Sequence, residues 1–156
     1  MLPTRMPDVS LRLDAFIPYR LSVTSNLVSE TIASAYQALF GLSIPEWRLI
    51  AVIAEDEGTT QQQVGRRTRM DKVTVSRATI GLVDRGLVER RPHASDRRSQ
   101  SLHLSAAGRD LYAQVAPKAL ELERRIFASF DPTEVAAFSE MLTRVQDATL
   151  KVREEA

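Results

Sequence analysis

The change of pattern at Gly86 constrains the fold of this chain more than any other feature. Before Gly86, apolar residues recur at a spacing of three or four, which is typical of helices. After it, the segments "LVERRP" and "SQSLHL" alternate apolar and polar residues, as half-buried strands do. The segment between them, "HASDRR", is made of turn and charged residues. The sequence therefore predicts a hairpin with an arginine-rich tip.

Two short helices are predicted directly before this hairpin. Thr60 and Gln63 have the spacing of a capping box, in which each side chain bonds the other residue's backbone amide. Asp71 is the expected N-cap of the second helix, and Gly86 is its expected stop. Two short helices followed by a hairpin are the order of a winged helix-turn-helix.

Longer helices are predicted on both sides of this segment. Apolar or small residues recur through residues 13–39 and predict one helix of about 25 residues. The only charge within residues 21–42 is Glu30, so we expect most of this helix to be covered. Further helices begin at the capping signals of "LSIPEW", "LSAAG" and "FDPTE", and Pro117 should kink the second of these three.

We therefore expect one mostly α-helical domain with a small β-hairpin wing. The winged helix-turn-helix lobe is expected over about residues 43–104. Dimerisation helices are expected over about residues 10–41 and 105–154.

The charge distribution indicates a polyanionic partner. The chain is nearly neutral, with 21 Lys and Arg against 20 Asp and Glu. Residues 66–98, however, hold ten bases and four acids, while both flanking segments are net negative. A solvated face normally mixes both signs, so this basic island favours a nucleic-acid surface.

The residue inventory argues against an enzyme and against a metal or cofactor site. The chain has no cysteine, which excludes thiolate catalysis, disulfides and cysteine zinc sites. It has two histidines, and we expect His93 at the hairpin tip and His103 on the outer face of a strand, neither facing a carboxylate. The start of the chain has no signal peptide pattern, and its apolar runs are too short for a membrane span, so a cytoplasmic protein is expected.

The second short helix supplies the candidate base-reading residues. If Val75 and Leu82 face inward, Val73 and Arg77 face outward. The planar fork of arginine matches guanine O6 and N7, and an outward valine suits a thymine methyl group. The candidate DNA-binding residues of this helix are Lys72, Val73, Thr74, Ser76 and Arg77.

The hairpin supplies the second group of candidates. Its arginines cannot build a core, but a narrow minor groove attracts inserted arginine side chains. Asp96 would tether an arginine in one rotamer and so reduce the entropy lost on binding.

The segment "DRRSQSLHLSAAG" resembles the wing-and-helix signature of the MarR-type transcriptional regulators. The resemblance extends through "PEWRLIAVIAE" and the helix-turn-helix to the flanking helices. It implies a homodimer with intertwined terminal helices, in which Arg98 enters the groove, Asp96 orients it and Arg97 lies alongside. Ser105 stands where many members have Thr, and Gly81 departs from the usual pattern.

The resemblance also implies a repressor that a small ligand releases, since some members bind aromatic acids or phenols beside the lobe. Residues that would line such a cleft are Tyr19, Arg20, Tyr36, Trp47 and Arg48. An arginine beside aromatic rings suits a carboxylate-bearing ring. The alternative is that Tyr36 and Trp47 are core aromatics.

We therefore expect a regulator that binds double-stranded DNA at a pseudo-palindromic operator. The competing hypothesis is a winged-helix module that binds protein. That module would need an apolar recognition face, whereas Lys72, Arg77 and the hairpin arginines make this face basic.

Overall fold

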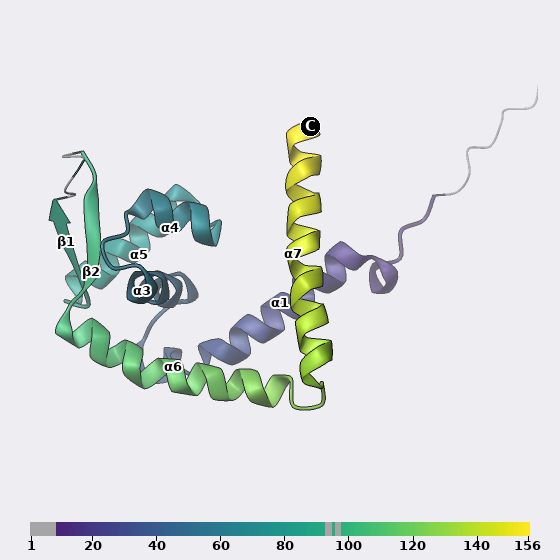
Figure 1. Cartoon of the computed structure of the whole chain (residues 1–156), viewed down its shortest axis with the longest axis horizontal. Coiled ribbons are helices and arrows are strands. Elements are labelled where there is room, and N and C mark those ends of the chain that lie inside the picture. The colour runs from purple at the N-terminus through teal and green to yellow at the C-terminus, as the bar shows by residue number, and fades with distance from the viewer. Residues whose placement is uncertain (1–8, 93–94, 96–97) are drawn as a thin grey trace, which may run out of the picture. The chain divides into compact units, whose positions relative to one another are not determined.

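The computed structural model describes residues 9–92, 95 and 98–156 (Figure 1). The described elements are a short 3-10 helix (Leu13–Ala15), α1 (Ile17–Ala33), α2 (Gln37–Phe40), α3 (Ile44–Glu55), α4 (Gln61–Thr68), α5 (Lys72–Asp84), β1 (Val88–Pro92), β2 (Gln100–Leu104), α6 (Ala106–Ile126) and α7 (Pro132–Glu155). The expected class, mostly helical with one hairpin, is confirmed. The chain divides into two compact units, of which one ends at Ala116 and the other begins at Pro117.

The predicted single helix over residues 13–39 is wrong, because the helix ends at Ala33. The amides of Ala35 and Tyr36 donate to carbonyls three residues back, and the backbone of Tyr36 leaves the helical region (φ −136°, ψ −20°) before α2 begins. Ala33, Ala35 and Tyr36 are all buried. The break at residues 34–36 thus coincides with a buried segment of the lobe.

The expected helix starts are confirmed by reciprocal hydrogen bonds. Each of the three capping boxes is formed, namely Ser43 with Glu46, Thr60 with Gln63 and Asp131 with Glu134. Ser105 caps α6, since its Oγ accepts from the amide of Gly108 at 3.0 Å. Each of these caps joins two residues that are three positions apart, so the spacing of residue types in the sequence was enough to predict where the helices begin.

The hairpin pairs β1 with β2 antiparallel, with Val88 opposite Leu104 and Pro92 opposite Gln100. Its base is joined to the turn between α3 and α4 by two backbone bonds. Gly58 N donates to Leu102 O at 2.9 Å, and Leu102 N donates to Thr59 O at 2.8 Å. The hairpin is therefore an extension of the helical lobe and not an isolated ribbon.

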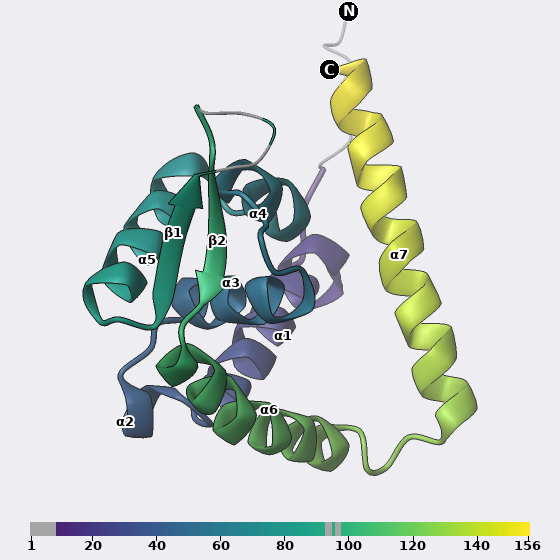
Figure 2. The same cartoon turned by 60° about the vertical axis from the view of Figure 1, so that its left-hand side comes forward.

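The hydrophobic core of the first unit is formed by the helix-turn-helix, α3 and the hairpin. In Figure 2 the hairpin runs beside α5, with α3 behind it, and α3 packs on both α5 and β2. The largest fully buried side chains are Tyr36, Leu42, Leu49, Ile50, Ile53, Val64, Val75, Leu82, Val88, Leu102, Leu104 and Val115. This core fixes the face that α5 turns outward.

The second unit holds the last part of α6 and all of α7. The ring of Phe127 contacts Phe130 and Phe138, with ring centroids 5.8 and 6.2 Å apart. None of the residues of α7 is buried, and its exposed apolar side chains include Val135, Phe138, Met141, Leu142, Val145 and Val152. None of the helices in the described ranges combines the length and the apolarity that crossing a bilayer requires.

Candidate nucleic-acid interface

Helix α5 buries one side and exposes cations and apolar residues on the other. Val75, Ala78, Thr79 and Leu82 are buried in the lobe. Val73 is 58% exposed and Arg77 is also exposed, as their spacing predicts. Lys72 and Ile80 are exposed as well, whereas Thr74 and Ser76 are half-buried. The exposed face of α5 therefore begins with Lys72 and Val73 and continues through Arg77 to Ile80.

The N-terminus of α5 is held by Asp71, whose Oδ1 accepts from Thr74 N at 2.7 Å. This backbone bond, a second bond from the Thr74 hydroxyl and the nearby Arg77 keep the pKa of Asp71 below its usual value. The carboxylate is thus charged at neutral pH and caps the helix. Because the Thr74 hydroxyl is directed to Asp71, it is less available to a bound ligand than the sequence implied.

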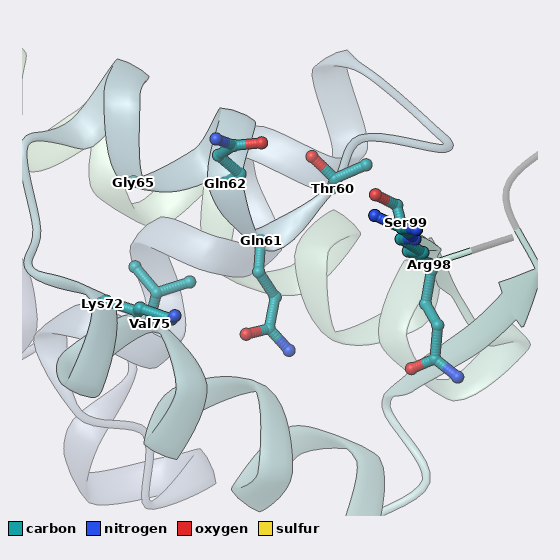
Figure 3. A pocket seen from close by; sticks show the side chains of 9 residues that line it. Thr60, Gln61, Gln62, Gly65, Lys72, Val75, Arg98 and Ser99 are labelled. Carbon is teal, nitrogen blue, oxygen red and sulfur yellow. The ribbon is translucent and has the colours of Figure 1, made fainter. Parts of the chain in front are cut away.

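A cavity of about 670 Å³ lies between the N-termini of α4 and α5 and the beginning of β2 (Figure 3). It is lined by Thr60, Gln61, Gln62, Gly65, Lys72, Val75, Arg98, Ser99 and Gln100. Figure 3 shows Gln61 extending from α4 into this space. Among the described residues, the lining holds the cations Lys72 and Arg98 and no carboxylate. The structure thus brings one predicted residue of α5 and one predicted residue of the hairpin segment to the same cavity.

Of the predicted hairpin residues, Arg98 lies within the described part of the chain and is exposed. Asp96 and Arg97 lie outside the described residues, and so does His93. On β1, Arg90 and Arg91 are exposed, and Arg91 pairs with Glu89 at 3.1 Å.

The expectation that His103 faces no carboxylate is wrong. His103 Nδ1 lies 3.5 Å from Glu57 Oε2, and its side chain is only 20% exposed. Its Nε2 lies 2.9 Å from Ser101 Oγ. Glu57 belongs to the α3–α4 turn, 46 positions earlier in the numbering, so no local pattern could reveal this contact. Among the described residues, no group of three or more His, Asp or Glu could hold a metal ion.

The structure brings together two of the five predicted ligand residues. Trp47 stacks on Tyr36, with ring centroids 5.5 Å apart, and also on Tyr112 at 5.8 Å. Burial raises the pKa of Tyr36, and Arg48 acts in the opposite direction. Tyr112 was missed because it lies 65 positions from Trp47. Tyr19 and Arg20 are exposed on α1, and the described ring contacts do not include Tyr19.

Comparison with known proteins relates this lobe to a known family. Residues 40–99 match the family model of the MarR family. The matched segment contains α3, α4, α5 and β1. It also contains the described residues that line the basic cavity, apart from Gln100.

Similar proteins include a transcriptional repressor and a solved regulator of this family. The HTH-type transcriptional repressor YetL of Bacillus subtilis is 26% identical over 109 residues, which cover 69% of this chain and 65% of the relative. A solved MarR/EmrR-family regulator from Acinetobacter superposes with a TM-score of 0.82 at 23% identity, covering 90% of this chain and 99% of that one.

A second similar structure was solved with a small molecule. It is CouR from Rhodococcus jostii bound to p-coumaroyl-CoA, with a TM-score of 0.75 and 22% identity. The alignment covers 87% of this chain and 95% of CouR. At this identity the likeness shows the shared MarR-type fold.

Gly81, which departs from the usual MarR pattern, is explained by packing. A Cβ atom at Gly81 would lie 3.1 Å from Glu46 Oε2, the carboxylate that completes the capping box of α3. Gly81 is half-buried, so a side chain there would share this space with the Glu46 carboxylate.

Proposed function

We propose that this chain is a homodimeric repressor that binds duplex DNA, with α5 in the major groove and the hairpin against the adjacent minor groove. The observation that carries the proposal is the basic cavity that α5 shares with the hairpin segment. Lys72 at the start of α5 and Arg98 beside β2 line one cavity, and the exposed face of α5 continues from it through Val73 and Arg77. A helix and a hairpin in this arrangement suit two neighbouring grooves.

The proposed contacts follow from side-chain chemistry. Arg77 reads a guanine through its two parallel donors, and Val73 meets a thymine methyl group. Lys72 and Ser76 bind the phosphate backbone, with Thr74 contributing when its hydroxyl leaves Asp71. Arg98 enters the minor groove. From the sequence we also assign Arg97 to the backbone and Asp96 to orienting Arg98.

Dimerisation is supported by the apolar surface of the flanking helices. Leu27 on α1 is 60% exposed, Leu120 on α6 is 54% exposed and Val152 on α7 is 64% exposed in the single chain. Exposed apolar area on this scale marks an interface. We therefore assign residues 10–41 and 105–154 to the dimer, and its twofold axis requires two half-sites about 34–36 Å apart.

A small aromatic acid is the proposed effector. The half-buried Trp47, stacked on the buried Tyr36, offers ring surface, and the neighbouring Arg48 offers a cation for a carboxylate. The ligand of CouR, which carries an aromatic acyl group, supports a compound of this class. Tyr19 and Arg20 would complete the site from α1. The competing explanation is that the rings only pack the lobe.

The DNA-binding proposal is tested by selecting bound fragments from a random duplex pool. We expect a pseudo-palindrome, and light scattering should give the mass of a dimer. Selection of an asymmetric or single-stranded target, or of no sequence, would favour the protein-binding module.

The effector proposal is tested with the selected operator and a panel of substituted benzoates and cinnamates. Arg48→Ala and Arg20→Ala should retain operator affinity and weaken release by the active compound. If both variants respond like the parent, these residues form no effector site.

A further inference from the structure

Glu57 joins three elements beside the hairpin. It lies in the turn between α3 and α4, and its two carboxylate oxygens lie 3.4 and 3.3 Å from the amide of Leu104, the last residue of β2. The same carboxylate lies 3.5 Å from His103 Nδ1 and 3.6 Å from Nη1 of Arg109 on α6. The Leu104 amide donates to this carboxylate, and the His103 and Arg109 side chains lie beside it. Glu57 thus lies against both the end of β2 and the start of α6.

The chain of contacts continues from His103 across the hairpin. His103 Nε2 lies 2.9 Å from Ser101 Oγ, and that hydroxyl donates to the carbonyl of Arg91 at 3.3 Å. Arg91 is the partner of Ser101 in the strand register. One line of polar contacts therefore runs from Glu57 through β2 to β1 and reaches the hairpin next to its last pair, Pro92 with Gln100.

Ser101 Oγ is the atom shared by the two ends of this line. Its hydroxyl donates to the carbonyl of Arg91, which only accepts, and it lies within hydrogen-bond distance of His103 Nε2. His103 Nδ1 faces the Glu57 carboxylate at 3.5 Å. Because both ring nitrogens have a polar neighbour, the orientation of the imidazole is restricted.

A fixed orientation matters because a two-stranded ribbon is barely stable by itself. The buried part of β2 is held by Leu102, which bonds Gly58 and Thr59. Beyond Leu102, the contacts of Ser101 support the beginning of β2, which Arg98 precedes by two positions. A side chain that is positioned before binding loses less entropy when it binds.

We propose that Glu57 and His103 are positioning residues for the hairpin, acting on DNA affinity through Arg98 without touching DNA. This inference rests on the proposed DNA-binding function. It differs from that function in assigning part of the affinity to residues that are neither among the described lining of the cavity nor on α5.

The test is a double-mutant cycle with the selected operator. His103→Ala should weaken binding by about five- to tenfold in the parent protein, which corresponds to the loss of about one hydrogen bond. In the Arg98→Ala background the same change should cost less than about twofold, because the group being positioned is gone. Equal losses in both backgrounds would overturn the proposal, since His103 would then act on the fold as a whole.

A conservative variant and a DNA-free measurement complete the design. His103→Gln can still donate to Glu57 and should recover most of the affinity. Hydrogen exchange should become faster at the β2 amides in Glu57→Ala and stay unchanged in α5, whereas unchanged exchange in β2 would contradict the proposal. If Arg77→Ala and Arg98→Ala both leave binding unchanged, the DNA-binding function itself is wrong. If only Arg77→Ala weakens binding, that function stands and the positioning inference fails.

Discussion

A Cβ atom on Gly108 would lie 2.1 Å from the carbonyl oxygen of Leu87. This approach places the first turn of α6 directly against the backbone that enters the hairpin. Ser105 secures the contact from both sides, since its Oγ donates to Gly86 O at 2.6 Å and its amide donates to Leu87 O at 3.0 Å. The junction between the helix-turn-helix and α6 thus depends on a residue without a side chain.

Two glycine-to-alanine substitutions should therefore have opposite effects. Gly108→Ala forces a backbone shift and should lower the free energy of unfolding by about 2–4 kcal/mol. Gly65→Ala places its Cβ 3.5 Å from Met70 O, an ordinary contact, and should raise the free energy of unfolding by about 0.5–1 kcal/mol through helix propensity. Urea unfolding of both variants measures this difference. Effects of the same sign would mean that the contact with Leu87 does not control this junction.

Arg77→Ala should weaken operator binding by about 1–3 kcal/mol and relax the preference at one position per half-site. The reason is the loss of a two-donor contact with one base. Arg153→Ala, which removes an exposed arginine near the C-terminal end of α7, is the charge-matched control and should leave that preference unchanged. Repeating the fragment selection with both variants is the measurement. A uniform loss at all positions would show that Arg77 binds phosphate instead.

Arg98→Ala should weaken binding to every operator that keeps a narrow flanking groove. The dependence of log affinity on log salt should also flatten by about one unit per hairpin, because one cation no longer displaces counterions. Fluorescence anisotropy over a salt series measures this slope. An unchanged slope with relaxed base preference would place Arg98 in the major groove.

Asp71 makes the stability of α5 acid-sensitive. Its pKa in the folded chain lies below the ordinary value of 3.8, so its contribution is present above that value and is lost as the pH falls through the folded value. Asp71→Asn keeps an acceptor for Thr74 but has no charge to lose. The thermal midpoint of the parent should therefore exceed that of Asp71→Asn near neutral pH, and the difference should shrink between about pH 4 and pH 2. A difference that is constant over this range would contradict the role of the carboxylate charge.

The sequence predicted the parts of the fold that short spacings control. Thr60 with Gln63 and Asp71 with Thr74 are three residues apart, and the hairpin follows from alternation next to a turn. The end of α1 at Ala33 was missed because it depends on burying Tyr36 against Trp47, which local propensity does not register. Tertiary packing commonly overrides such propensity.

The candidate site was also only partly predictable from the sequence. Val73 and Arg77 face outward because Val75 and Leu82 are apolar on the same helix, so the sequence could predict their exposure. The contact of Glu57 with His103 depends on backbone bonds between a turn and a distant strand. Nothing in the neighbourhood of either residue indicates the other.

The position of Trp47 between Tyr36 and Tyr112 gives the protein an intrinsic optical probe. Trp47 is the only tryptophan, so all indole emission arises from this one stack of rings. A compound that enters between the rings must alter the surroundings of a single fluorophore, and its titration needs no label. If a compound changes this emission equally in the parent and in the hairpin variants, it binds at the rings and away from the basic cavity.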